Sequence, residues 1–179
     1  MFRIAIHGAG GIAAFHARSV AAIDDAELVA VSSRRAGSAS AFCDAHGGRA
    51  YPDLERLLVA EKPDVLIVTT PSGAHLEPVL AAARHRVHVL CEKPLEIALA
   101  RVDRMIEACD AVGVRLGGVF QQRMSPLYQM VHQACAQGRF GEQALINCYV
   151  PWWRDDAYYA PPRWQGSAAL DGAGALMNQ

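Results

Sequence analysis

Short apolar runs alternate with alanine-rich amphipathic stretches over residues 1–120 of the chain. The run at residues 65–70 is rich in β-branched residues and has no polar alternation, which is typical of a strand buried on both faces of a parallel sheet. Helical patterns separate the apolar runs, and this repeat predicts an α/β fold with a doubly wound parallel sheet. The expected strands are residues 3–6, 28–32, 65–70, 87–91 and 114–120.

Capping and turn residues mark the ends of the helices expected in this part of the chain. Asp53 is placed to cap a short helix that begins at the next residue, and Gly47 and Gly48 end the helix before it. The expected helices are residues 12–22, 38–46, 54–60, 74–86 and 96–112.

The character of the chain changes after residue 120. A polar stretch over residues 121–126 precedes a helix expected at 126–137, and Ser125 is placed to cap it. No further strand–helix repeat follows. The remaining residues are expected to form a strand at 144–150, an irregular loop at 151–164 and a glycine-rich turn from 171 that leads into a helix start.

The first strand leads directly into a glycine cluster with the spacing Gly8-x-Gly10-x-x-Ala13. A strand, a tight turn and a helix in this order are typical of a dinucleotide-binding fold. Gly8 allows the turn, Gly10 lets a pyrophosphate approach the backbone, and the helix start favours its negative charge. An ordinary strand–helix turn is the alternative interpretation. The predicted cofactor contacts in the cluster are Gly8, Ala9, Gly10, Gly11 and Ile12.

Two domains follow from these patterns. Residues 1–121 are expected to form a dinucleotide-binding Rossmann domain. Residues 122–179 are expected to be the beginning of an α+β substrate domain, which is incomplete because it has too few strands to bury its faces.

The loop after the second expected strand bears on the choice of cofactor. In dinucleotide-binding folds, the residue about 20 positions after the glycine pattern contacts the adenosine ribose, and an acidic residue there favours NAD. Here this residue is Ser33, followed by Arg34 and Arg35. A hydroxyl and a guanidinium suit a 2′-phosphate better than a free diol, so the loop favours NADP over NAD. A solvated basic loop is the alternative interpretation.

Composition and charge exclude some classes of protein. The 179 residues carry a net charge of -1, which does not favour a nucleic-acid partner or an anionic membrane surface. No apolar run reaches the length of a membrane span. The cysteines are odd in number and lack C-x-x-C spacing, so we expect no zinc site, no disulfide framework and a reduced, cytoplasmic setting. They are Cys43, Cys91, Cys109, Cys135 and Cys148.

Several local motifs together resemble the Gfo/Idh/MocA family of NAD(P)-dependent oxidoreductases, over the whole chain. The most specific is Glu92-Lys93-Pro94-Leu95, which follows the strand expected at 87–91. The others are the glycine cluster, Thr69-Thr70-Pro71 with His75, Gln122-Arg123-x-x-Pro126, and the stretch from Asp171 to Gln179.

The resemblance implies that Lys93 is the catalytic residue and that it contacts both the cofactor, beside the nicotinamide, and the substrate hydroxyl. Oxidation of a secondary alcohol removes a hydride from carbon and a proton from oxygen, so a group beside the oxygen must handle the proton. A lysine can do this when its surroundings lower its pKa. Pro94 would fix the turn that directs Lys93, through an expected cis Lys93–Pro94 bond. Glu92 would orient the lysine or contact the cofactor.

The resemblance assigns further binding residues. Thr70, Pro71 and His75 match a loop over the ribose on the nicotinamide side. Arg123 matches an arginine near the cofactor, although Gln121 and Gln122 stand where an asparagine is often seen. Asn178 matches a position that binds a substrate hydroxyl.

The family pattern continues past the glycine turn to Gly-x-His, and the sequence ends just before that pair. The chain is therefore expected to be truncated, and its open second domain leads us to expect a homo-oligomer. The expected function is hydride transfer between NAD(P) and a sugar, polyol or related secondary alcohol or its ketone. The alternative is a catalytically incompetent dinucleotide-binding fragment or sensor.

Overall fold

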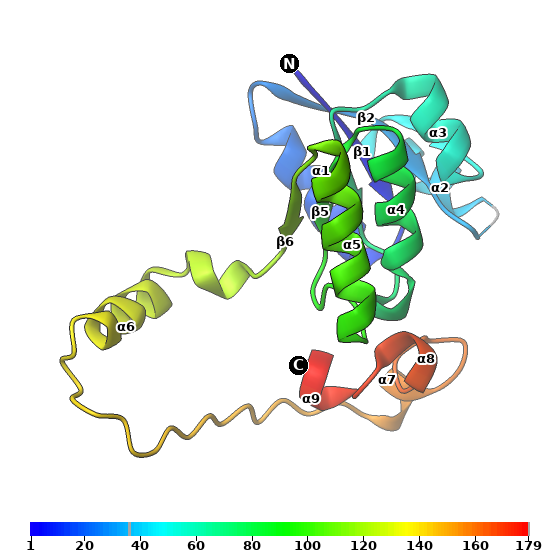
Figure 1. Ribbon diagram of the computed structural model, residues 1–179. Coiled ribbons are helices and arrows are strands. Elements are labelled where there is room, and N and C mark those ends of the chain that lie inside the picture. The colour runs from blue at the N-terminus through cyan, green and yellow to red at the C-terminus, as the bar shows by residue number, and fades with distance from the viewer. Residues whose placement is uncertain (36, 179) are drawn as a thin grey trace.

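A six-stranded parallel sheet forms the centre of the computed structural model, which describes residues 1–35 and 37–178 (Figure 1). The strand order is β3-β2-β1-β4-β5-β6, and all five neighbouring pairs are parallel. The predicted doubly wound α/β sheet is therefore confirmed. The strands are β1 (Phe2–His7), β2 (Ala26–Ser32), β3 (Arg49–Tyr51), β4 (Val65–Val68), β5 (His88–Cys91) and β6 (Leu116–Gly118).

Helices cover both faces of the sheet (Figure 1). Side chains of α1 and α2 pack on one face, and those of α3, α4 and α5 pack on the other. This arrangement explains why the strand sequences are continuously apolar: Ile67 points into the first layer, whereas Leu66 and Val68 point into the second. The helices are α1 (Gly11–Ala21), α2 (Ser38–His46), α3 (Leu54–Glu61), α4 (Leu76–Arg84) and α5 (Leu99–Val112), and a 3-10 turn, η1 (Ser72–Ala74), precedes α4.

The local signals for helix ends agree with the structure in most places. Asp53 caps α3, because its side chain accepts a hydrogen bond from the Arg56 amide at 2.9 Å. Gly47 ends α2 with φ 84°, a conformation that favours glycine. Helix α5 begins at Leu99 rather than at residue 96, because Glu96 is buried and its carboxylate binds the Ile97 amide instead of starting the helix.

The chain beyond the sheet contains helices and irregular segments. These elements are η2 (Gln121–Met124, a 3-10 turn), α6 (Pro126–Ala136), α7 (Asp156–Tyr159), α8 (Ala168–Asp171) and α9 (Ala175–Asn178). The predicted loop at 151–164 therefore contains one short helix, α7. Ser125 occupies the N-cap position of α6, but its side chain makes no capping hydrogen bond.

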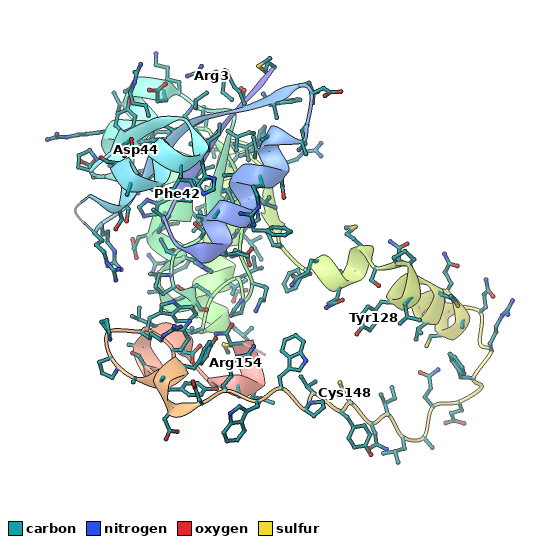
Figure 2. The ribbon with its side chains drawn as sticks, turned by 180° about the vertical axis from the view of Figure 1, so that it is seen from behind. Arg3, Phe42, Asp44, Tyr128, Cys148 and Arg154 are labelled. Carbon is teal, nitrogen blue, oxygen red and sulfur yellow. The ribbon has the colours of Figure 1, made fainter. Side chains whose placement is uncertain are left out.

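The strand predicted at 144–150 is wrong. These residues are irregular and exposed, and Cys148 lies in an extended stretch away from the sheet (Figure 2). A strand needs a neighbouring strand to pair its backbone groups, and none of the described residues from 122 to 178 forms a strand. The expectation of an α+β second domain therefore gives way to a short helical tail.

The end of this tail returns to the sheet domain, and α8 packs on η1 (Figure 1). Two glycines make the close approach possible. A Cβ on Gly73 would overlap the carbonyl oxygen of Ala169, and a Cβ on Gly172, which has φ 64°, would lie 3.0 Å from the Ile97 side chain. These contacts bring α9 to the carboxyl ends of the strands.

Candidate functional site

A cavity of about 730 Å³ opens at the carboxyl ends of the strands, where the sheet order reverses between β1 and β4. Ligands of open α/β sheets bind at such reversal points. The cavity is lined by His7, Gly8, Ala9, Gly10, Gly11, Ile12, Ser33, Arg34, Arg35, Ser38, Thr69, Thr70, Pro71, Ser72, Glu92, Lys93, Trp164, Gln165 and Asn178.

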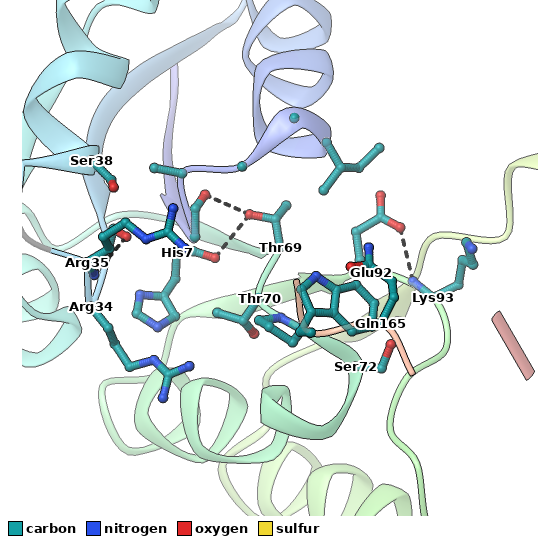
Figure 3. Close-up of a pocket in the computed structure, with 18 of the residues that line it drawn as sticks. His7, Arg34, Arg35, Ser38, Thr69, Thr70, Ser72, Glu92, Lys93 and Gln165 are labelled. Carbon is teal, nitrogen blue, oxygen red and sulfur yellow. Dashed lines mark hydrogen bonds between the residues drawn. The ribbon is translucent and has the colours of Figure 1, made fainter. Parts of the chain in front are cut away.

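The glycine turn joins β1 to α1 and passes directly beside the end of β4. Gly8 has φ 108°, and a Cβ there would lie 2.8 Å from the Thr69 backbone, so a larger residue does not fit. The Thr69 hydroxyl donates to the carbonyl oxygens of His7 and Gly8, at 3.1 and 2.8 Å (Figure 3). Ala13, the last residue of the glycine pattern, is fully buried, and its small side chain lets α1 pack closely on the sheet.

The start of α1 is open toward the cavity. A Cβ added to Gly10 or Gly11 would meet no atom within 4 Å, and no side chain caps the helix. No acidic residue lies in its first turn. Free amide groups and the helix dipole therefore face a space that an anionic group can enter.

One end of the cavity is basic, and the other holds Glu92 and Lys93 (Figure 3). At the basic end, Arg34 and Arg35 have exposed side chains, and Ser38 lies at the start of α2. The Arg35 amide donates to the Ser33 hydroxyl at 3.3 Å, which holds the loop in a turn. The sequence analysis named Ser33, Arg34 and Arg35 in this loop but missed Ser38, although the start of the expected helix was a visible signal.

His7 forms part of the floor at the basic end. Its Nδ1 lies 2.8 Å from the Ser32 hydroxyl, and the residue is 7% exposed. Burial, together with the nearby Arg34 guanidinium, lowers the pKa of His7 from 6.5 to about 4. The imidazole is therefore neutral at neutral pH.

The turn after β5 presents Lys93 to the cavity. The Lys93–Pro94 bond is cis, as predicted. Glu92 is buried, and its Oε2 accepts from the Lys93 amide at 3.1 Å while its Oε1 lies 2.8 Å from Nε2 of His16 on α1. The contact between Glu92 and His16 therefore connects α1 to the turn of residues 92–94, here called the lysine turn.

His75 lies behind the cavity rather than on its surface. It is 1% exposed, and its Nε2 is 2.8 Å from the Thr70 carbonyl oxygen. Its Nδ1 is 3.0 and 3.1 Å from the carbonyl oxygens of Pro94 and Leu95. His75 therefore braces the loop of Thr70 and Pro71 against the lysine turn, and direct contact with a ligand stays an untested prediction.

Residues that are distant in sequence complete the end of the cavity near Lys93. The Lys93 ammonium donates to the carbonyl oxygen and to Oδ1 of Asn178, at 2.8 and 3.3 Å. Trp164 and Gln165 line the same end, and no local sequence signal pointed to them. Arg123 is not brought to the cavity: it lies in η2 with its guanidinium 5.4 Å from the centre of the Phe120 ring.

Two features are absent from the part of the chain that the structure describes. Among residues 1–35 and 37–178, no group of His, Cys, Asp and Glu side chains is arranged to hold a metal ion. In the same part of the chain, no helix has the length and apolarity needed to cross a bilayer.

A parallel sheet with order 3-2-1-4-5-6, a glycine turn and an uncapped helix start are the features of the Rossmann fold. A family model described as the oxidoreductase family with an NAD-binding Rossmann fold matches residues 2–120. The chain belongs to this family, Gfo/Idh/MocA, as its motifs predicted.

Characterised relatives are dehydrogenases that act on CH–OH groups. The chain is 35% identical over 146 residues to myo-inositol 2-dehydrogenase of Thermotoga maritima, with 81% of this chain and 44% of the relative covered. It is 31% identical over 167 residues to glucose-6-phosphate 3-dehydrogenase of Bacillus subtilis, with 88% and 47% covered. The chain thus spans about half the length of these curated relatives.

A solved structure matches nearly all of the chain. The WlbA dehydrogenase of Chromobacterium violaceum, crystallised with NADH and UDP-GlcNAcA, superposes with a TM-score of 0.94 at 32% identity. The match covers 99% of this chain and 52% of that one. The similarity therefore includes the helical tail as well as the sheet.

The lowered pKa of His7 predicts a loss of stability in acid. In the unfolded chain His7 is protonated near pH 6.5, whereas in the folded chain it is protonated only near pH 4. The free energy of unfolding therefore falls as the pH decreases through this window. Between pH 7 and pH 5 the expected loss from this group is about 2 kcal/mol. Urea unfolding of His7→Gln should show a correspondingly smaller difference between the two pH values.

His132→Gln is the matched control, because His132 is exposed on α6. It should keep the pH dependence of the native chain. An equal pH dependence in His7→Gln and the native chain would contradict the assignment of a neutral, buried His7.

Proposed function

We propose that the chain binds a nicotinamide dinucleotide in this cavity and takes part in hydride transfer between NAD(P) and a secondary alcohol of a sugar or polyol, or its ketone. The main support for this proposal is the cavity itself. It is lined at one place by the open, uncapped helix start at Gly10 and Gly11 and at another by Lys93. Free space where a Cβ would lie, facing unpaired amides, fits a pyrophosphate.

The two ends of the cavity suggest the orientation of the cofactor. The loop of Ser33 and Arg34 would hold the adenosine ribose, and the loop of Thr70 and Pro71 would hold the ribose on the nicotinamide side. The bound dinucleotide would supply or accept the hydride. Lys93 would hold or release the proton of the substrate oxygen, because its ammonium is a titratable donor in a partly buried position.

The basic end of the cavity favours NADP over NAD. Ser33 and Arg34 offer a hydroxyl and a guanidinium, and Arg35 and Ser38 add two more groups to the same wall. Charge-assisted hydrogen bonds from arginine to phosphate are strong and directional. A free ribose diol does not make full use of these donors.

The cofactor preference is tested by replacing Ser33 with an acidic residue. Ser33→Asp places a carboxylate where a 2′-phosphate would lie, so the Kd for NADPH should rise about tenfold or more while NADH binding is kept. The Kd values are measured by fluorescence titration of each nucleotide. Arg139→Ala, which changes an exposed arginine beyond α6, should leave both Kd values unchanged.

Equal NADPH and NADH affinities in the native chain and in Ser33→Asp would contradict the NADP assignment. Failure of both nucleotides to bind would contradict the proposed function as a whole.

The role of Lys93 is tested by separating turnover from cofactor binding. Lys93→Ala removes the group that handles the proton, so kcat should fall by about 10²–10⁴ while the Kd for the dinucleotide changes little. Turnover is assayed with inositols, phosphorylated hexoses and UDP-linked sugar acids, the classes that the relatives' names suggest. Lys62→Ala, at the end of α3 away from the cavity, is the control.

Near-normal turnover in Lys93→Ala would contradict the lysine assignment. Dinucleotide binding without turnover in the native chain, over the whole panel, would instead support the alternative function, a dinucleotide-binding fragment or sensor without catalytic activity.

A further inference from the structure

Asp171 is a buried carboxylate that no step of the proposed reaction uses. It ends α8 and is 2% exposed. Its Oδ2 accepts from the Gly166 amide at 2.8 Å, and its Oδ1 accepts from Nδ2 of Asn178 at 2.7 Å. The carboxylate is therefore shared between a backbone group of the tail and the side chain that contacts Lys93.

The contact with Asp171 leaves the Asn178 amide one orientation. A carboxylate can only accept hydrogen bonds, so it must face the NH2 group of the amide. An ammonium can only donate, so it must face the amide oxygen. The structure has this arrangement, with the Lys93 ammonium 3.3 Å from Oδ1 of Asn178.

We propose that Asp171 is a positioning residue that fixes the orientation of Asn178 and, through it, the position of the Lys93 ammonium. The relay runs from a buried carboxylate through a carboxamide to the lysine. The catalytic value of this arrangement rests on the proposed function, in which Lys93 handles the substrate proton. Without Asp171, the ammonium alone would orient the amide, and the Asn178 side chain would no longer be held by a second partner on Nδ2.

The position of Asp171 suits this task because its backbone is hydrogen-bonded on both sides. The Asp171 amide donates to Ser167 at 2.7 Å, and its carbonyl oxygen accepts from Gly174 at 3.3 Å. Gly172, the next residue, packs against Ile97 in the segment that follows the lysine turn. A fixed carboxylate can orient a neighbouring group, whereas a mobile one cannot.

The sequence offers a direct probe of the relay, because the chain has two lysines, Lys62 and Lys93. Lys62 is exposed at the end of α3 and serves as an internal reference in every sample. Competitive acetylation of the whole chain with acetic anhydride at one pH, read by peptide mass spectrometry, gives the reactivity of Lys93 relative to Lys62. Hydrogen bonding of the Lys93 ammonium lowers this ratio.

Asp171→Asn should raise the ratio about tenfold, because the amide at position 171 keeps the Gly166 hydrogen bond and turns a donor toward Asn178. The Asn178 side chain then rotates, so the Lys93 ammonium loses its hydrogen bond to Oδ1 and keeps only the one to the Asn178 carbonyl oxygen. Asp155→Asn is the control: Asp155 caps α7 by accepting from the Tyr158 amide at 3.0 Å and has no hydrogen bond to the relay, so the ratio should not change.

A swap of the two side chains separates positioning from a merely structural role. In Asp171→Asn/Asn178→Asp, the amide again donates to a carboxylate, and the second carboxylate oxygen accepts from Lys93. The ratio should return to the native value or below it. If Asp171 served only to stabilise the turn at α8, the double variant would stay as reactive as the single one.

An unchanged ratio in Asp171→Asn, or no recovery in the double variant, overturns the proposal. The labelling needs neither dinucleotide nor substrate, so its result is independent of the proposed function. A chain that shows the expected ratios but binds no dinucleotide would contradict the proposed function and leave the relay in place.

Discussion

The reversal of strand order between β1 and β4 is the constraint on which the rest of the structure depends. At this point the segments that follow β1 and β4 run to opposite sides of the sheet, so a crevice remains between them at the carboxyl ends of the strands. The crevice exists because Gly8 can pass within contact distance of Thr69. Two hydrogen bonds from the Thr69 hydroxyl then hold the glycine turn against β4.

The lysine turn is held from three sides by groups that lie far apart in the sequence. Glu92 connects it to α1 through His16, and His75 connects it to the loop after β4. The tail approaches from the third side and brings Asn178 to the ammonium. The loop after β4, the helix of the glycine turn and the tail are thus coupled to one side chain.

Much of the fold could be predicted from the sequence, because strands buried on both faces are continuously apolar and glycine turns have fixed spacing. The turn at Gly8 was predictable from its local glycine spacing, whereas the turn at Lys93 was predicted from the family resemblance. The strand β3 was missed because three residues carry too little pattern.

The tail was the least predictable part, since its structure depends on contacts rather than on local pattern. Residues 144–150 have the composition of a strand, but a strand exists only beside a partner. Trp164 and Gln165 reach the cavity because Gly73 lets α8 dock on η1, which is a relation between distant segments. Arg123, in η2, lies over the Phe120 ring and is not among the residues that line the cavity.

The central claim is that a dinucleotide binds at the open start of α1. Its most direct test is a titration of the ¹⁵N-labelled chain with NADPH, followed through backbone amide resonances. Binding at the start of α1 should produce saturable shifts at Gly10, Gly11 and Ile12 and leave the resonances of α6 unchanged. Saturation without shifts at these three amides, or the absence of any shift, would contradict it.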